Sequence, residues 1–385
     1  MVGYLRAQAT EFLRALRRHR ESGPGAGAGT GAGPGTGTAA AANGAIGEPG
    51  RPAQHADDVD AARALRRAAR RISGTLHTFQ PLLDPGWAEE MRPELAWLSG
   101  TLALEHAYAS RLERLLQALH RLSGSTAFPA PRPVGRATAT ATTTAVPPAA
   151  PTTHPASANR GNLTVGAAKA GALLDRQLTL ARTRAHSTAL QALGSSRFHA
   201  VADKVALLAS EVPLSSAGRR AASAASDAAP VDLRPLATAA QERLTDAVAA
   251  LPLVTAGSPY NAEALVHGLS PDPAPHPQDT PWHQVRLLLR LHRYALEALT
   301  GADSGTAGAA DDSVDVRLLA AGEALDRHRD ASEAAAAAAQ AARTPRIAPA
   351  TAYALGVLHA DQRHEVEAAR YAFRHSWRKE PIRLP

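Results

Sequence analysis

Residues 286–299 read RLLLRLHRYALEAL, and residues 66–79 read RRAARRISGTLHTF. Each stretch has arginine at its first and fifth positions and ends on an apolar or aromatic face. A further cationic or titratable residue, Arg63 or His283, stands three residues before each first arginine. Residues three and four apart lie on one side of an α-helix, so both stretches predict amphipathic helices. Because the spacing is the same in both, we interpret them as copies produced by an internal duplication.

The arginines of each stretch form a ridge of one charge along the predicted helix, within roughly 80° of arc. Residues 61–77 contain five arginines and no acidic residue, so the repulsion between them has no partner within the helix. Guanidinium groups bind phosphate oxygens in pairs, and the pattern therefore predicts an anion with repeated phosphates. The candidate phosphate-binding residues are Arg63, Arg66, Arg70, Arg71, His77, His283, Arg286, Arg290 and Arg293.

A second interpretation of the ridges stays open. The arginines are then solvated, or they pair with acidic residues of neighbouring helices. For any one arginine this interpretation is favoured, whereas two clusters with the same spacing favour a bound anion. The acidic residues concerned are Glu89, Glu90, Asp326 and Asp330.

Composition predicts an all-α fold, because alanine and leucine dominate and aromatic residues make up only 4%. The formal charge is +7, and nearly every cation is arginine. The chain has no cysteine, which excludes disulfides and thiolate metal sites. The N-terminus lacks the apolar run of a signal peptide, and no apolar stretch approaches ~18 residues. We therefore expect a cytoplasmic protein without a membrane span.

Low-complexity segments rich in Ala, Gly, Thr, Ser and Pro divide the chain. Such segments bury too little apolar area to offset the entropy of ordering, and they predict disordered linkers or loops at 21–56, 123–164, 215–230 and 301–312. The helical blocks between them predict two four-helix bundles. The first comprises an N-terminal helix at 1–20, helices at 57–122 and last helices at 165–214. The second comprises 231–300 and closing helices at 313–385.

Several motifs, taken in order, resemble the CHAD family, whose name stands for conserved histidine α-helical domain. They are the H-x-x-R pattern at 283–286, R-x-x-R-x-x-x-R-R at 63–71 followed by TLHTF, ELAWLS at 94–99, RHRDA at 327–331 and the terminal helix at 355–377. The resemblance covers nearly the whole chain apart from the linkers.

The resemblance implies two bundles related by a pseudo-twofold axis, with a basic cavity between them that binds inorganic polyphosphate. No E-x-E-x-K motif of the CYTH domain that often accompanies the family occurs, so no catalytic module, cofactor or metal is expected. The sequence leaves two alternatives open for the role of a cytoplasmic protein of this kind: a place on polyphosphate granules, or partnership with an enzyme of phosphate metabolism. The residues that match phosphate-contacting positions of the family are Arg66, Arg70, His283, Arg286, Arg290 and Arg293.

The chain departs from the family pattern at several positions that are usually cationic. These departures predict a shallower basic cavity and a lower affinity than is typical of the family. The positions are Arg63, where the family has its first histidine, and Ser73, Leu291, His106, Ala107, Gln241 and Glu242.

Other functions compete with phosphate binding as interpretations of this sequence. A nucleic-acid-binding protein is the main alternative, although the ridges offer few aromatic side chains for stacking on bases. A helical scaffold for protein–protein interaction is a further alternative. Metal binding by His359, Asp361 and His364 is disfavoured. Protonation of histidines near pH ~6.5 predicts that anion binding strengthens modestly under mild acid.

Overall fold

The computed structural model describes residues 1–22, 51–124, 155–220, 232–269, 276–303 and 316–377. These residues form helices and connecting turns and contain no β-strand. Leu83 and Leu214 form an isolated antiparallel bridge. The all-α fold class is therefore confirmed within the described residues.

The helices of the first part of the chain are α1 (Val2–Ser22), α2 (Arg51–Thr78), α3 (Pro85–Ser123), α4 (Pro155–Leu193) and α5 (Ser196–Ser210), with a short 3-10 helix η1 (Gln80–Leu82). Asp84 caps α3, because its side chain accepts a hydrogen bond from the backbone N–H of Trp87 at 2.9 Å. Ser195 caps α5 in the same way, through the N–H of Phe198 at 3.2 Å.

The helices of the second part are α7 (Arg234–Ala249), α8 (Ala262–Gly268), α9 (Thr280–Asp303), α10 (Val316–Ala342) and α11 (Pro349–Trp377). Two 3-10 helices, η2 (Thr255–Gly257) and η3 (Pro277–Asp279), precede α8 and α9. The short helix α8 was not predicted from the sequence. Its start is fixed by Asn261, whose side chain accepts a hydrogen bond from the N–H of Ala264 at 3.0 Å.

Helices extend into the predicted linkers: residues 51–56 belong to α2 and residues 155–164 to α4, and residues 216–220 and 301–303 are helical as well. Extending a helix costs much less than nucleating one. Proline is tolerated in the first turn, where an N–H would lack a partner in any case. The remainder of the predicted linkers at 21–56, 123–164, 215–230 and 301–312 lies mostly outside the described residues.

Among the described residues, buried apolar side chains form three clusters. The first cluster joins α1, α2, α5 and the start of α3 with the end of α9 and one buried residue of α7. The second joins the end of α3 with α4, α10 and α11, and the third joins α7, α9, α10 and the end of α11. Because α3 and α4 each span 39 residues, they reach beyond the first cluster and pack against helices of the predicted second bundle. The internal duplication stays a prediction.

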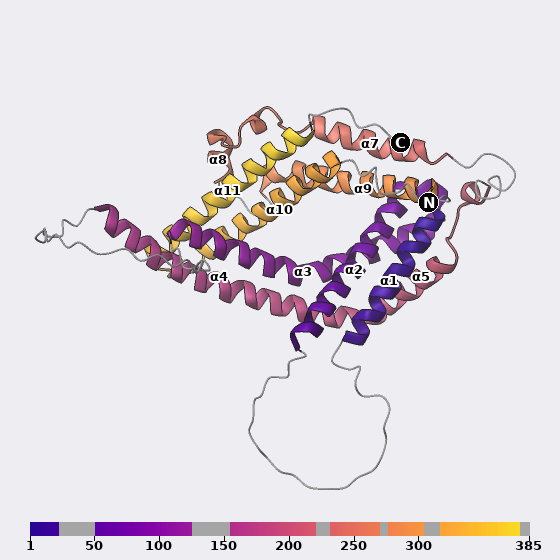
Figure 1. Ribbon diagram of the computed structural model, residues 1–385, viewed down its shortest axis with the longest axis horizontal. Helices are drawn as coiled ribbons and strands as arrows, with labels where there is room; N and C mark the ends of the chain where they lie inside the picture. Colours follow the sequence, from indigo (N-terminus) through magenta and orange to yellow (C-terminus); the bar gives the residue numbers. More distant parts are fainter. Residues whose placement is uncertain (23–50, 125–154, 221–231, 270–275, 304–315, 378–385) are drawn as a thin grey trace, which may run out of the picture.

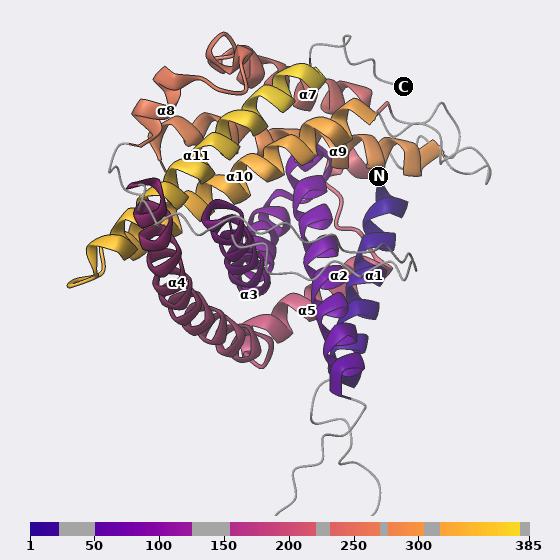
Figure 2. The same ribbon diagram turned by 60° about the vertical axis from the view of Figure 1, so that its left-hand side comes forward.

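Figure 1 shows α1, α2 and α5 gathered at one end, with α3 and α4 side by side and running toward α10 and α11. In Figure 2, α9 and α10 lie above α2 and α3. Helices α2 and α9 pack against each other where Gly74 meets Tyr294. A Cβ atom at Gly74 would lie 2.5 Å from Cδ2 of Tyr294, so only glycine permits this close approach of the two arginine-bearing helices.

Replacing Gly74 by alanine is expected to destabilise the protein by about 1–3 kcal/mol, because the added methyl group forces the two helices apart. The matched control is Gly100→Ala in α3, where a Cβ atom would meet nothing within 4 Å. There the same change should stabilise by about 0.5–1 kcal/mol, because alanine loses less backbone entropy than glycine in a helix. Urea unfolding of the two variants measures both effects, and equal signs would show that α2 and α9 do not pack as described.

Candidate anion-binding site

A central cavity of about 390 Å³ lies between α2, α3, α9 and α10. Arginines of both predicted ridges line it, and in total it contains seven arginines and three acidic residues. The charge of its wall is therefore strongly positive. The lining residues are Arg66, Arg70, Ala103, His106, Ala107, Ser110, Arg111, Arg114, Arg286, Arg290, Asp326, Arg329, Asp330 and Glu333.

The apolar faces of α2 and α9 determine where their arginines point. Leu65 and Ile72 of α2 are fully buried in the first cluster, and this leaves the arc with Arg66 and Arg70 facing the cavity. On α9, Leu289 is buried in the third cluster, and the ridge beside it faces the same cavity. The periodicity that predicts two amphipathic helices therefore also explains how their guanidinium groups meet.

The guanidinium groups of α2 and α9 repel one another across the cavity. Burial, together with the charges of Arg66 and Arg290, lowers the pKa of Arg70 to about 10. Burial and the charge of Arg290 also lower the pKa of Arg286 to about 10. Both groups keep their charge at neutral pH, so the cavity holds cations that an entering anion would stabilise.

Carboxylates of α10 neutralise part of this charge. Oδ1 of Asp326 accepts hydrogen bonds from Nε of Arg286 at 2.5 Å and from Nη2 of Arg290 at 3.0 Å. Glu333 pairs with Arg329 at 2.7 Å and also with Arg111. The alternative in which ridge arginines pair with acidic residues is therefore realised for α9 through Asp326.

Arg66 and Arg70 of α2 differ from Arg286 and Arg290 of α9 in this respect. No described residue forms a hydrogen bond or ion pair with Arg66 or Arg70, and burial is the main cause that lowers the pKa of each. Because buried or half-buried charges are costly without a partner, these two arginines are the part of the site most in need of an external anion.

Comparison with known proteins identifies the family. Residues 48–339 match the CHAD domain. The chain belongs to the CHAD family. Among solved structures, it is similar to "PptA from Streptomyces chartreusis", with 62% sequence identity over 98% of each chain and a TM-score of 0.68. No curated protein matches the chain.

Two of the predicted site residues of this CHAD protein form ion pairs with carboxylates outside the central cavity. Nε of Arg71 lies 3.0 Å from Oε2 of Glu297, which also accepts a hydrogen bond from the Tyr4 hydroxyl at 2.7 Å. This cluster links α1, α2 and α9, so Arg71 has a structural partner. Arg63 pairs with Asp60 at 3.2 Å and lines a smaller cavity of about 110 Å³ that shares Arg66 with the central one.

The predicted histidines and Arg293 do not line the central cavity either. His77 lines a different cavity, bounded by α7, and burial lowers its pKa. The ring of His283 faces that of His328, with centroids 5.6 Å apart, and burial lowers the pKa of His283. His292 is fully buried, and Arg293 lies against α10. The expected strengthening of binding by mild acid therefore loses its basis in these histidines.

The structure adds Arg111 and Arg114 of α3 and Arg329 of α10 to the site. Their helices mix acidic and basic residues, so no run of one charge marks them in the sequence. The three-residue spacing of Arg111 and Arg114, which places them on one side of the helix, is the signal that could have found them. Gln241 and Glu242 lie on α7, outside this cavity, and so do not reduce its charge.

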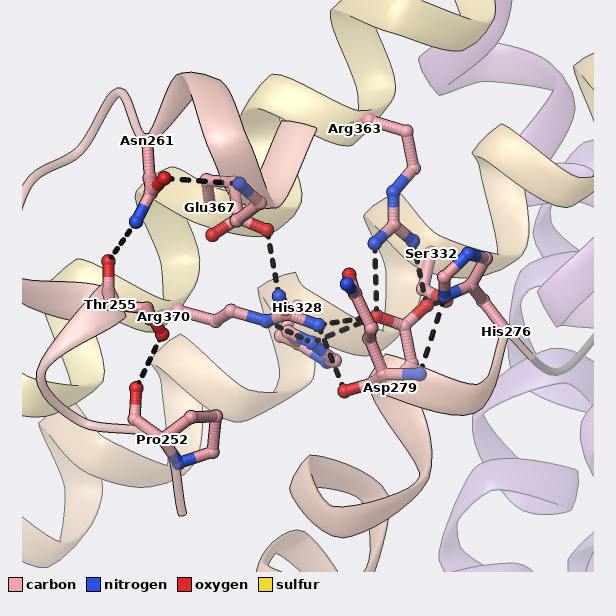
Figure 3. A network of polar contacts seen from close by, with 12 residues as sticks. Pro252, Thr255, Asn261, His276, Asp279, His328, Ser332, Arg363, Glu367 and Arg370 are labelled. Carbon is pink, nitrogen blue, oxygen red and sulfur yellow. Dashed lines mark hydrogen bonds and ion pairs between the residues drawn. The ribbon is translucent and has the colours of Figure 1, made fainter. Parts of the chain in front are cut away.

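A buried polar network holds the start of α9 in place (Figure 3). Asp279, the last residue of η3, is fully buried and accepts hydrogen bonds from Arg363 and Arg370, both at 2.7 Å, and from the hydroxyl of Ser332. Burial alone would raise the pKa of Asp279, but the hydrogen bond and charge of Arg363 lower it to about 2. Because Asp279 directly precedes α9, the network holds this arginine-bearing helix against α10 and α11.

Among the described residues, no group of three or more His, Cys, Asp or Glu side chains is arranged to hold a metal ion. Asp361, one of the three candidate metal ligands in the sequence, accepts two hydrogen bonds from Arg121, both at 3.0 Å. The ring of His364 contacts that of Tyr260, and burial lowers the pKa of His359. Within the same part of the chain, no helix has the length and apolar character needed to cross a membrane.

Proposed function

We propose that this CHAD protein binds inorganic polyphosphate in the central cavity and does not act on it chemically. The observation that carries the proposal is that Arg66 and Arg70 of α2 line the same cavity as Arg286 and Arg290 of α9. Membership of the CHAD family supports it, because CHAD domains are associated with polyphosphate binding. Four guanidinium groups in two rows match an anion that repeats its charge along a chain.

Binding would be driven by electrostatic capture. Each phosphate neutralised by an arginine releases condensed counterions, so affinity falls as salt concentration rises. Bidentate bonds from guanidinium groups to phosphate oxygens then fix the chain in the cavity. Capture of this kind needs no nucleophile, metal or cofactor.

Nucleic acid is the alternative ligand, because its backbone also presents phosphates in series. The residues that line the central cavity include no Phe, Tyr or Trp. Proteins that bind single strands without sequence preference usually stack bases on such side chains. The lining therefore favours a polyanion without bases. Location on polyphosphate granules in the cytoplasm, and association with an enzyme of phosphate metabolism, belong to the same proposal.

A competition titration tests the proposal. Labelled single-stranded DNA is bound to the purified protein and displaced by long-chain polyphosphate at several salt concentrations. We expect polyphosphate to bind more tightly at every salt concentration. We also expect a log–log slope of about −3, since four arginines each contribute about −0.7 by analogy with single-stranded nucleic acid. Tighter binding of DNA throughout would favour the nucleic-acid alternative, and no binding of either ligand would favour a helical scaffold.

A further inference from the structure

The carboxylate of Asp326 lies against the two cavity-lining arginines of α9. A single oxygen, Oδ1, accepts hydrogen bonds from both Arg286 and Arg290. The arginine side chains are only 14% and 24% exposed, whereas the side chain of Asp326 is 52% exposed. A solvated carboxylate therefore covers two largely buried cations, and its exposure leaves it free to turn toward water.

The two arginine rows of the cavity are thus unequal before any anion enters. Arg66 and Arg70 have no partner among the described residues, whereas Arg286 and Arg290 share one carboxylate. An incoming anion gains most at the unpaired row, because no protein group has to be displaced there. To reach the α9 row it must compete with a carboxylate that is held nearby at high effective concentration.

We propose that Asp326 is an internal competitor, which the bound anion displaces from Arg286 and Arg290, and that it thereby sets the affinity of the cavity. The inference rests on the proposed function and deepens it, since it assigns a regulating residue to the same site. Engagement is ordered: the anion first binds Arg66 and Arg70, and its next phosphates then replace Asp326 on α9. Phosphate succeeds because it offers more oxygens to the two guanidinium forks than the single oxygen of Asp326.

A structural role for Asp326 makes different predictions. If Asp326 only stabilised α9 against α10, its replacement would lower the stability of the protein and leave its affinity for the anion unchanged. An internal competitor opposes the anion directly. Its removal then raises affinity even where stability falls, and it adds one net positive charge to the cavity.

The test compares Asp326→Asn with the wild type in titrations with long-chain sodium polyphosphate across salt concentrations. We expect affinity to rise on the order of tenfold and the log–log salt slope to become steeper by about 0.7, the value for one further neutralised phosphate. The matched control is Asp361→Asn, because Asp361 pairs with Arg121 outside the cavity and the net charge changes equally. The control should keep wild-type affinity and slope.

A double-mutant cycle separates competition from a general electrostatic effect. Arg290→Gln should lower affinity more in the Asp326→Asn background than in the wild type, because only there is Arg290 free of its carboxylate. If the wild type binds polyphosphate and Asp326→Asn binds it with the same affinity and the same salt slope, this inference alone is overturned. Absence of polyphosphate binding by both proteins would overturn the proposed function as well.

Discussion

A variant with both Arg286→Glu and Arg290→Glu is expected to bind long-chain polyphosphate at least about 100-fold more weakly than the wild type. A hydrogen bond to a charged group contributes about 1.5–3 kcal/mol, and 1.4 kcal/mol corresponds to tenfold in affinity. Losing two such contacts accounts for the expected effect, and the new carboxylates repel the phosphates in addition. Isothermal titration calorimetry at one fixed salt concentration measures the change.

The matched control is Arg14→Glu with Arg18→Glu on α1. These arginines also lie one helical turn apart and share one carboxylate, that of Glu11, at 4.0 and 3.2 Å. Their side chains are exposed and lie outside the central cavity, so the change in net charge is the same while the site stays intact. Affinity should stay within about twofold of the wild type. An equal loss in both variants would mean that net charge, not the cavity, governs binding.

The new glutamates lie beside Asp326, and repulsion between these carboxylates can unfold the protein. A second variant therefore tests the site without adding negative charge. Arg66→Gln with Arg70→Gln removes two cations that have no partner among the described residues and that burial destabilises. We expect this variant to be at least as stable as the wild type and to lose affinity about as strongly. Wild-type affinity in this folded variant would place the bound anion elsewhere.

The sequence was sufficient to predict the two rows of arginines, on α2 and on α9, that line the central cavity. Residues 61–77 contain a run of arginines without any acidic residue, and that imbalance can be recognised without a structure, although Arg63 pairs with Asp60 just before the run. The walls of the cavity that α3 and α10 provide could not be found in this way. On α3 and α10, Arg111 and Arg329 stand among acidic residues, and only the packing of the helices shows that they face the same space.

Helical spacing also predicted more residues for the site than line the central cavity. It places a side chain on a face of a helix, but it does not say which neighbour reaches that face first. Arg71 and His283 lie on the predicted ridges, yet Glu297 of another helix pairs with Arg71, and His283 faces the buried ring of His328. Both partners are more than 40 residues away in the sequence, so these outcomes depend on tertiary packing that periodicity does not contain. The same limit applies to the predicted two bundles, which stay a prediction: periodicity does not show that the long helix α3 contributes to two different clusters of buried side chains.

Replacing Asp279 by asparagine is expected to destabilise the protein by about 3–5 kcal/mol, the usual cost of removing one partner from a buried ion pair. Asp279 is fully buried, and it binds Arg363 and Arg370, whose side chains are only 3% and 6% exposed. Asparagine keeps the shape of the side chain but leaves the two guanidinium groups without its charge. Urea unfolding at neutral pH measures the loss. Asp60→Asn is the control, because Asp60 pairs with Arg63 at the surface and is 74% exposed, where such a pair contributes about 0–1 kcal/mol.

The pH dependence of the same comparison identifies the charge of Asp279 as the cause. Its pKa is about 2 in the folded protein and about 3.9 in an unfolded chain. A lowered pKa of a carboxyl group contributes stability that is complete above the unfolded value and is lost as pH falls through the folded value. The difference in unfolding free energy between wild type and Asp279→Asn should therefore be constant from about pH 5 upward and shrink between about pH 4 and pH 2. A difference that persisted unchanged to pH 2 would mean that shape, rather than charge, is what Asp279 supplies to the start of α9.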